Sequence, residues 1–119
     1  MKEYKKKYYE KYREKVIARS QARYYSFEPA VRKRIARNHS LKIEYGITLE
    51  KYQEMLDSQN GVCFICKKSH KKTLHVDHNH STGAVRKLLC VRCNMIVAHL
   101  ENTPELFVAA QRYLEATGQ

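Results

Sequence analysis

The chain has 119 residues, enough for about one small domain, and a fold of this size gains from an additional tie such as a metal. It carries 23 Lys and Arg against 12 Asp and Glu, a formal net charge of +11. The N-terminus lacks the apolar run of a secretory signal, and no window approaches the ~20 apolar residues of a membrane span, so we expect no membrane partner and a reducing, cytoplasmic environment.

The positive charge is concentrated near the N-terminus. Residues 1–40 hold 13 Lys and Arg and four Glu, a charge of +9, whereas residues 41–119 carry only +2. Such a basic arm suits a polyanion, of which nucleic acid is the usual one. A solvated charged helix or an acidic membrane surface is the alternative, but the large residues of the arm are tyrosines rather than membrane-entering aliphatic residues.

The first predicted element is a basic helix over residues 2–25. No Pro or Gly interrupts it, and Tyr4, Tyr8 and Tyr12 recur at intervals of four residues, which places them on one face. These tyrosines either pack against a neighbouring helix or stack on bases. The helix either folds alone or becomes ordered on DNA or on a partner chain. Its predicted nucleic-acid contacts are Lys5, Lys6, Lys7, Lys11, Arg13 and Arg19.

A second helix is predicted from Pro29 to Tyr45, because proline fits the first turn of a helix and Gly46 fits a left-handed C-terminal cap. Its basic set adds Arg32 and Arg34 to the predicted nucleic-acid contacts. Its candidate buried positions are Val31, Ile35, Leu41 and Tyr45.

A third, short helix over residues 49–58 follows, with Thr48 as its N-terminal cap. Its predicted inward residues are Tyr52, Met55 and Leu56. Residues 59–61 then form a turn.

Four cysteines follow in two C-x2-C pairs. Cys63 and Cys66 form the first pair, and Cys90 and Cys93 form the second. In a reducing compartment this spacing predicts a tetrahedral zinc site rather than disulfides. Four thiolates fill the coordination shell of zinc and leave no position for water, so the predicted zinc is structural.

Between the pairs, residues 74–77 and 84–89 are predicted strands joined by a turn at 79–83. The second pair opens a helix that runs to about Asn102. A last helix starts at Pro104 with Thr103 as its cap. We expect it to bury an inward face made of Leu106, Phe107, Ala110, Tyr113 and Leu114.

Asp77, His78 and Asn94 carry the residue types of metal and proton-transfer chemistry. Carboxylate and amide oxygens suit Mg²⁺ or Mn²⁺, and a neutral imidazole can take a proton from a water that attacks a phosphodiester. Asn94 directly follows the last cysteine, so the zinc would fix the helix start that presents it. Because neighbours in a regular strand point to opposite faces, Asp77 and His78 can share a site only if the strand ends or twists there.

The motifs C-F-I-C at 63–66, L-H-V-D-H-N-H-S-T-G at 74–83 and V-R-K-L-L-C-V-R-C-N at 85–94 resemble the recombination endonuclease VII family of HNH, or ββα-metal, nucleases, best known from bacteriophages. Y-G-I-T-L-E-K-Y at 45–52 also resembles the helix that often precedes the family's first cysteine pair.

The resemblance implies zinc at the four cysteines and a catalytic divalent metal at Asp77 and Asn94. It further implies His78 as general base and cleavage that leaves 5′-phosphate and 3′-hydroxyl ends. His80 and His75 match positions that line the family's active site. Arg86 either holds a phosphate or is an ordinary arginine on the strand surface.

We therefore predict an α+β fold, mostly helical, with a zinc-clamped ββα-metal (HNH) core, basic N-terminal helices and one C-terminal helix. Residues 1–45 would form a basic DNA-binding arm and residues 46–119 the nuclease domain. The predicted function is a metal-dependent DNA endonuclease acting on duplex or branched DNA, either as a monomeric nickase or as a homodimer. If encoded by a phage, it would work in the bacterial host cytoplasm. The alternative is a non-catalytic zinc-knuckle DNA-binding module.

Overall fold

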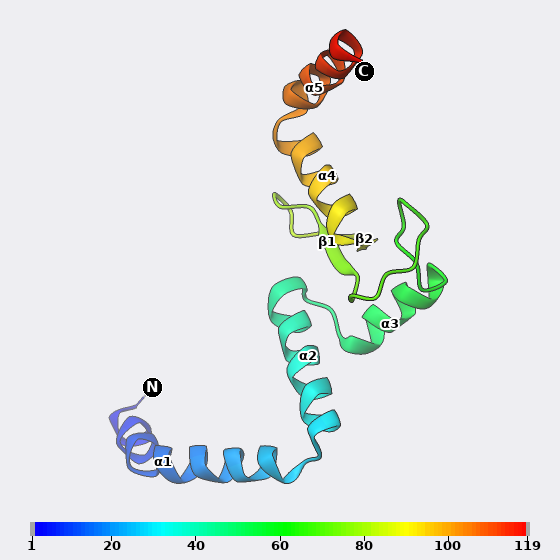
Figure 1. The fold of residues 1–119 in the computed structure, drawn as a ribbon. Coiled ribbons are helices and arrows are strands. Elements are labelled where there is room, and N and C mark those ends of the chain that lie inside the picture. The colour runs from blue at the N-terminus through cyan, green and yellow to red at the C-terminus, as the bar shows by residue number, and fades with distance from the viewer. Residues whose placement is uncertain (1, 119) are drawn as a thin grey trace.

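The computed structural model describes residues 2–118, which form five helices and one two-stranded sheet (Figure 1). The helices are α1 (Glu3–Ser26), α2 (Pro29–Tyr45), α3 (Leu49–Ser58), α4 (Val91–Asn102) and α5 (Pro104–Thr117), and the strands are β1 (His75–His78) and β2 (Val85–Leu89). The predicted α+β, mostly helical fold is confirmed. The molecule is elongated, 71 × 34 × 24 Å, with α1 and α5 extending away from a central hairpin.

The corner between α2 and α3 is built by local chemistry that the sequence predicts. Gly46 adopts a left-handed φ of 70°, and its N–H donates to the carbonyl of Lys42, 3.0 Å away. The Thr48 hydroxyl accepts from the N–H of Lys51 at 3.1 Å and caps α3. The side chain of Asn38 adds a bond that the sequence did not suggest, because its oxygen accepts from the N–H of Leu49 at 2.9 Å.

Thr103 was expected to cap α5, and it is the N-cap residue of that helix, with a carbonyl that accepts from the N–H of Leu106 at 3.0 Å. The structure shows no capping bond from its side chain to α5. Instead the Thr103 hydroxyl donates to the carbonyl of His99 at 3.1 Å, and its own N–H donates to the same carbonyl at 2.9 Å. Thr103 therefore satisfies the open carbonyl end of α4.

The hairpin is antiparallel and irregular at its centre. Val76 lies opposite Leu88 and His78 lies opposite Val85, so two steps along β1 match three steps along β2. The extra residue forms a bulge beside Asp77. At the turn, the N–H of Asn79 donates to the carbonyl of Ala84 at 2.8 Å. The bulge and this turn set the directions of the polar side chains at the end of β1.

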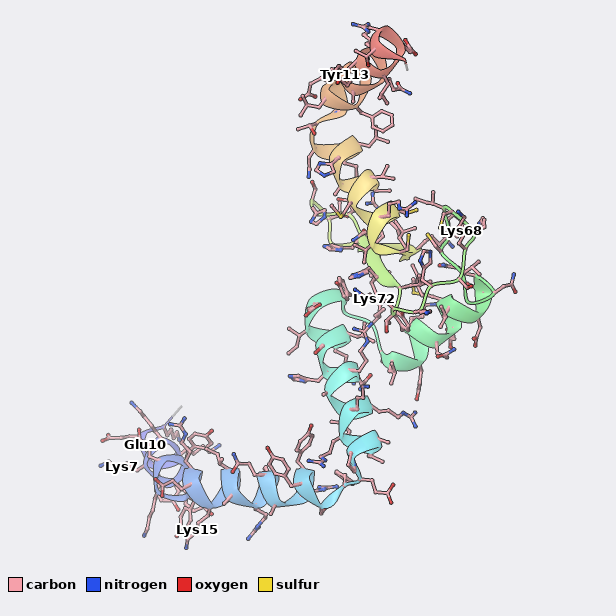
Figure 2. The ribbon with its side chains drawn as sticks, in the orientation of Figure 1. Lys7, Glu10, Lys15, Lys68, Lys72 and Tyr113 are labelled. Atoms are coloured by element: carbon pink, nitrogen blue, oxygen red, sulfur yellow. The ribbon has the colours of Figure 1, made fainter. Side chains whose placement is uncertain are left out.

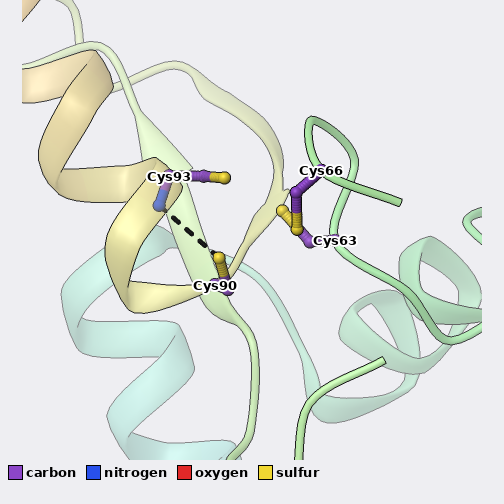
Figure 3. Close-up of side chains that lie close together, drawn as sticks. All are labelled: Cys63, Cys66, Cys90 and Cys93. Atoms are coloured by element: carbon purple, nitrogen blue, oxygen red, sulfur yellow. Dashed lines mark hydrogen bonds between the residues drawn. The ribbon is translucent and has the colours of Figure 1, made fainter. Parts of the chain in front are cut away.

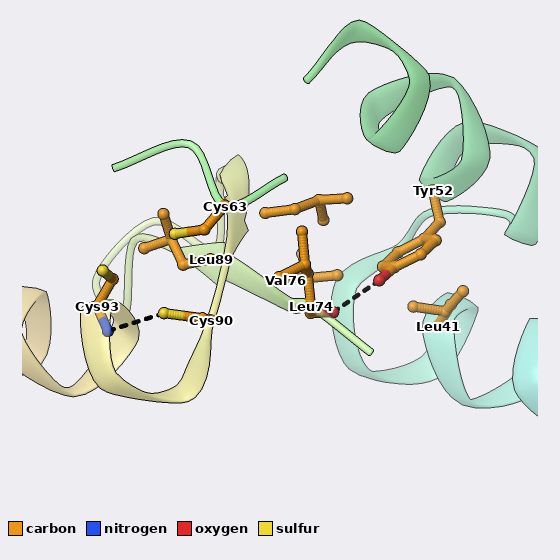
Figure 4. Close-up of a cluster of buried hydrophobic side chains, with 9 residues drawn as sticks. Leu41, Tyr52, Cys63, Leu74, Val76, Leu89, Cys90 and Cys93 are labelled. Atoms are coloured by element: carbon orange, nitrogen blue, oxygen red, sulfur yellow. Dashed lines mark hydrogen bonds between the residues drawn. The ribbon is translucent and has the colours of Figure 1, made fainter. Parts of the chain in front are cut away.

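A small core joins the hairpin, α3 and the end of α2 (Figure 4). Its buried apolar residues besides cysteines are Leu41, Tyr52, Leu74, Val76, Leu88 and Leu89. The Tyr52 hydroxyl donates to the carbonyl of Leu74 at 2.7 Å, which ties α3 to the start of the hairpin. Val31 and Ile35 were also expected to be buried, but they are 41% and 40% exposed. They lie in the first half of α2, whereas the core contacts only the end of this helix.

Gln59, just after α3, completes the core with an amide rather than an apolar group. It is buried, and its amide nitrogen donates to the carbonyl of Leu88 at 2.9 Å while its oxygen accepts from the N–H of Leu88 at 2.9 Å. The same nitrogen donates to the carbonyl of Val62 at 2.9 Å. The Gln59 side chain thus pairs with β2 as a neighbouring strand would.

The outer helices bury little of their surface. Neither α1 nor α5, as described between residues 3 and 117, contains a buried residue. The expected inward face of α5 is therefore wrong: Leu106 is 61% exposed and Tyr113, labelled in Figure 2, is 66% exposed. The reason is geometric, since α5 follows directly after α4 and continues away from the hairpin (Figure 1). None of the helices within residues 2–118 is long and apolar enough to span a membrane.

Candidate functional site

The four cysteines converge between the loop after α3 and the start of α4 (Figure 3). Their sulfur atoms all lie within 4.8 Å of one another, and all four thiols are free. A tetrahedral zinc with Zn–S bonds of about 2.3 Å places its sulfurs about 3.8 Å apart. The cluster therefore fits a metal ion such as zinc, as the spacing of the cysteines predicts.

The backbone around Cys63 forms the tight turn that such a site needs. Lys67 adopts a left-handed φ of 59°, and its N–H donates to the carbonyl of Cys63 at 3.0 Å. Burial raises the pKa of the Cys63 thiol. Backbone hydrogen bonds from Cys90, Cys66 and Ile65 outweigh this effect and lower the pKa of Cys63 to about 6. The turn thus favours a thiolate at Cys63, the form that binds a metal, whereas burial and the neighbouring thiols raise the pKa of Cys93 to about 12.

Cys90 is the N-cap of α4, and Cys93 lies in the first turn of that helix. The Cys90 sulfur is 3.5 Å from the N–H of Cys93 and caps the helix (Figure 3). The N–H of Asn94 donates to the carbonyl of Cys90 at 2.9 Å. A metal held by these cysteines therefore fixes the backbone that carries Asn94.

Next to this cluster lies a small cavity of ≈ 80 Å³ between β1, β2 and α4. It brings together Asp77, His78 and Asn94, the candidate metal and proton-transfer residues, with His80, which was expected to line the active site. The other lining residues are Tyr45, Val76, Arg86, Ala98 and Glu101. His75 is exposed on β1 and is not among the residues that line this cavity.

Asp77 and His78 are neighbours at the end of β1, yet both line this cavity. In a regular strand these neighbours would face opposite sides. Here the register shifts between Val76 and His78, and both side chains line the same cavity. Asp77 is 8% exposed, and His78 is half-buried.

The His78 ring is close to two other rings. Its centroid is 5.3 Å from that of Tyr45, in an edge-on arrangement, and 4.4 Å from that of His80. Tyr45 comes from the last residue of α2, so the end of the basic helix also forms a wall of this cavity. These contacts restrict the orientation of the imidazole.

Arg86 makes the strongest ionic contacts in the cavity. Its Nε and Nη2 donate to the two oxygens of Asp77, at 2.7 and 3.0 Å, and its Nη1 donates to Glu101. The hydrogen bonds that Arg86 donates, to Asp77 first and to Glu101 second, raise its pKa above its ordinary value, so the guanidinium stays charged. Arg86 is therefore not an ordinary arginine on the strand surface.

Glu101 was missed in the sequence, although a signal was present. It lies seven residues after Asn94, two turns further along α4, which places both on one face of the helix.

The oxygen atoms of Asp77 and Asn94 suit Mg²⁺ or Mn²⁺, and the two residues share one cavity. Both oxygens of Asp77 accept hydrogen bonds from Arg86, so a metal ion bound there would compete with the guanidinium for this carboxylate. The oxygens of Asp77 and Asn94 therefore fit a divalent ion when Arg86 gives up hydrogen bonds to Asp77.

The residues predicted to contact nucleic acid are spread over α1 and α2. Lys5, Lys6, Lys7, Lys11, Arg13 and Arg19 are exposed on α1, and Lys7 and Lys15 mark this helix in Figure 2. Arg34 is exposed on α2. Arg32 is half-buried, and its guanidinium lies 5.5 Å from the centre of the Tyr25 ring, so it is less available than its neighbours.

Two curated phage proteins are similar to this chain. The gene 59 protein of Mycobacterium phage L5 is 42% identical over 73 residues, which cover 59% of this chain and 44% of that protein. The gene 59 protein of Mycobacterium phage D29 is 47% identical over 55 residues, which cover 44% of this chain and 33% of that protein. The chain thus spans less than half the length of these relatives. No solved structure matches it.

The family model of recombination endonuclease VII matches residues 38–116. This range runs from the second half of α2 through the cysteine cluster and the cavity into α5, and it covers more than half of the chain. The chain therefore belongs to the recombination endonuclease VII family.

Proposed function

We propose that this protein is a metal-dependent DNA endonuclease of the HNH type, which hydrolyses phosphodiester bonds and leaves 5′-phosphate and 3′-hydroxyl ends. The observation that carries the proposal is the meeting of Asp77, His78 and Asn94 in one small cavity. A module that only binds DNA needs no such combination of a carboxylate, an imidazole and an amide. Family membership supports DNA as the substrate.

In this mechanism Asp77 and Asn94 would hold Mg²⁺ or Mn²⁺, and the ion would supply stabilisation of the charge that develops on the phosphate. His78 acts as general base and takes the proton of the attacking water. The rings of Tyr45 and His80 hold its imidazole in place. The cysteine cluster, loaded with zinc, positions Asn94 through the first turn of α4.

The basic arm, residues 1–45, is proposed to bind the DNA while residues 46–119 cut it. The exposed lysines and arginines of α1 give this arm its charge, and tyrosines such as Tyr4, 78% exposed, offer surfaces on which bases could stack. Duplex and branched DNA are both candidate substrates, and a homodimer would place two cavities on the two strands. Encoded by a phage, the enzyme would act in the bacterial host cytoplasm.

The test is cleavage of supercoiled plasmid and of a four-way junction with Mg²⁺ or Mn²⁺. We expect His78→Ala to slow cleavage by about 10²- to 10⁴-fold, the usual contribution of a general base, with DNA binding retained. His39→Ala removes an exposed imidazole on α2, outside the cavity, and should cut at the wild-type rate.

Cleavage by His78→Ala at the wild-type rate would refute the general-base role. If the wild-type protein cuts neither DNA form while still binding DNA tightly, the nuclease proposal is wrong. The protein would then be a zinc-knuckle DNA-binding module.

A further inference from the structure

Glu101 lines the cavity but has no part in the mechanism proposed above. Among the described residues around the cavity, it and Asp77 are the acidic ones. The two side chains approach from different elements, Asp77 from β1 and Glu101 from α4. Their side chains differ in exposure, 11% for Asp77 and 40% for Glu101.

The Arg86 guanidinium joins these two carboxylates and uses all three of its nitrogens. Nε and Nη2 engage Asp77, Nη2 also donates to the carbonyl of His78 at 3.3 Å, and Nη1 donates to Glu101. The group is thus held from two sides. The bond from Nη1 to Glu101 does not involve Asp77, so it can persist when the bonds to Asp77 are broken.

This arrangement matters because a divalent ion and a bidentate arginine compete for the same two oxygens of Asp77. With Asp77 as its single charged partner, the guanidinium would be left without a charged partner wherever the ion took over both Asp77 oxygens. Glu101 offers a second charged partner, so Arg86 can leave Asp77 and still remain at the edge of the cavity. A planar guanidinium fixed there suits the two oxygens of a phosphate.

We infer that Glu101 is a positioning residue that anchors Arg86. While it is held by Glu101, the guanidinium releases the Asp77 carboxylate to the divalent ion and faces the phosphate of the DNA. The inference rests on the nuclease function proposed above. It assigns Glu101 no contact with the ion and none with the DNA, because its effect passes through Arg86. A double-mutant cycle can therefore separate this role from a direct one.

The test measures Mn²⁺ affinity by electron paramagnetic resonance, on the full chain loaded with zinc and without DNA. The proteins compared are the wild type, Glu101→Gln, Arg86→Ala and the double variant. We expect Glu101→Gln to weaken Mn²⁺ binding by about tenfold when Arg86 is present, a coupling within the usual range for contacting residues. In the Arg86→Ala background the same change should cost about threefold or less, the screened effect of a partly exposed charge.

Glu105→Gln is the matched control, because it removes the same charge from an exposed position at the start of α5 and should leave Mn²⁺ affinity unchanged. An equal loss in both backgrounds would mean that Glu101 acts on the ion directly, and it would overturn the inference. No loss in either background, or no Mn²⁺ binding by the wild type, would overturn it as well.

Cleavage then separates this inference from the proposed function. At saturating Mn²⁺, Glu101→Gln should slow single-turnover cleavage, and the double variant should be no slower than Arg86→Ala. A double variant that is slower still would refute the anchoring role while leaving the nuclease function standing. Coupling in Mn²⁺ affinity without cleavage of any DNA by the wild type would instead refute the nuclease function alone.

Discussion

Replacement of Gln59 by leucine should destabilise the hairpin core by about 3 kcal/mol. The side chain makes three hydrogen bonds of 2.9 Å, two with the backbone of Leu88 and one with the carbonyl of Val62. Each contributes about 1 kcal/mol on average. The carbonyl of Leu88 keeps the N–H of Phe64 as a partner, but the buried N–H of Leu88 loses the Gln59 oxygen. An unsatisfied buried donor costs about 1–3 kcal/mol, which sets the range of the estimate at about 2–4 kcal/mol.

The chain offers a matched control in Gln53, one turn and a half earlier on α3. Its amide donates to Asp57 at 2.9 Å on the exposed face of the helix, so Gln53→Leu should cost about 0.5 kcal/mol or less. Urea unfolding at fixed excess zinc, followed through the amide resonances of β1 and β2, measures both variants. Hydrogen exchange at Leu88 should also accelerate in Gln59→Leu. If Gln59→Leu is no more destabilising than Gln53→Leu, the side chain does not act as a substitute strand.

Two further predictions concern the arm and the cysteine cluster. Deletion of residues 2–25 should weaken DNA binding and lower the slope of log K against log salt by about 3 if three phosphate contacts are lost; an unchanged slope would make α1 a packing element. Chelation of zinc, or Cys63→Ser, should unfold the hairpin, since structural zinc contributes on the order of 10 kcal/mol to folding. Acidification should also release the ion, because protonated thiols do not bind it. Hairpin amide resonances that persist without zinc would contradict this.

Local signals in the sequence were sufficient for the secondary structure. The observed helices and strands begin and end close to the predicted residues, because proline, glycine and threonine act through their immediate neighbours. Gly46 is the clearest case, with its left-handed φ of 70° at the predicted cap. The cysteine cluster could also be predicted, because its C-x2-C spacing nearly determines its geometry.

Features that depend on tertiary placement could not be predicted in this way. The spacing of the apolar residues of α5 predicts a buried face, but none of these residues is buried. Burial depends on the direction of the helix relative to the core, which local sequence does not give. Gln59 read as part of a turn, because nothing local shows that its amide reaches β2, 29 residues away. The pairing of Arg86 with Asp77 likewise occurs beside the bulge, and no residue type in either strand predicts a bulge there.

The elongated shape of the molecule has a consequence for its footprint on DNA. A compact domain of this length has a radius of gyration of about 13–14 Å, whereas this chain has 21.8 Å. Its longest dimension, 71 Å, equals the rise of about 20 base pairs of B-form DNA at 3.4 Å each. If the arm binds DNA as proposed, a protein of 14.1 kDa would shield about two helical turns, and α1 rather than the cavity would set how far that protection extends from the cut.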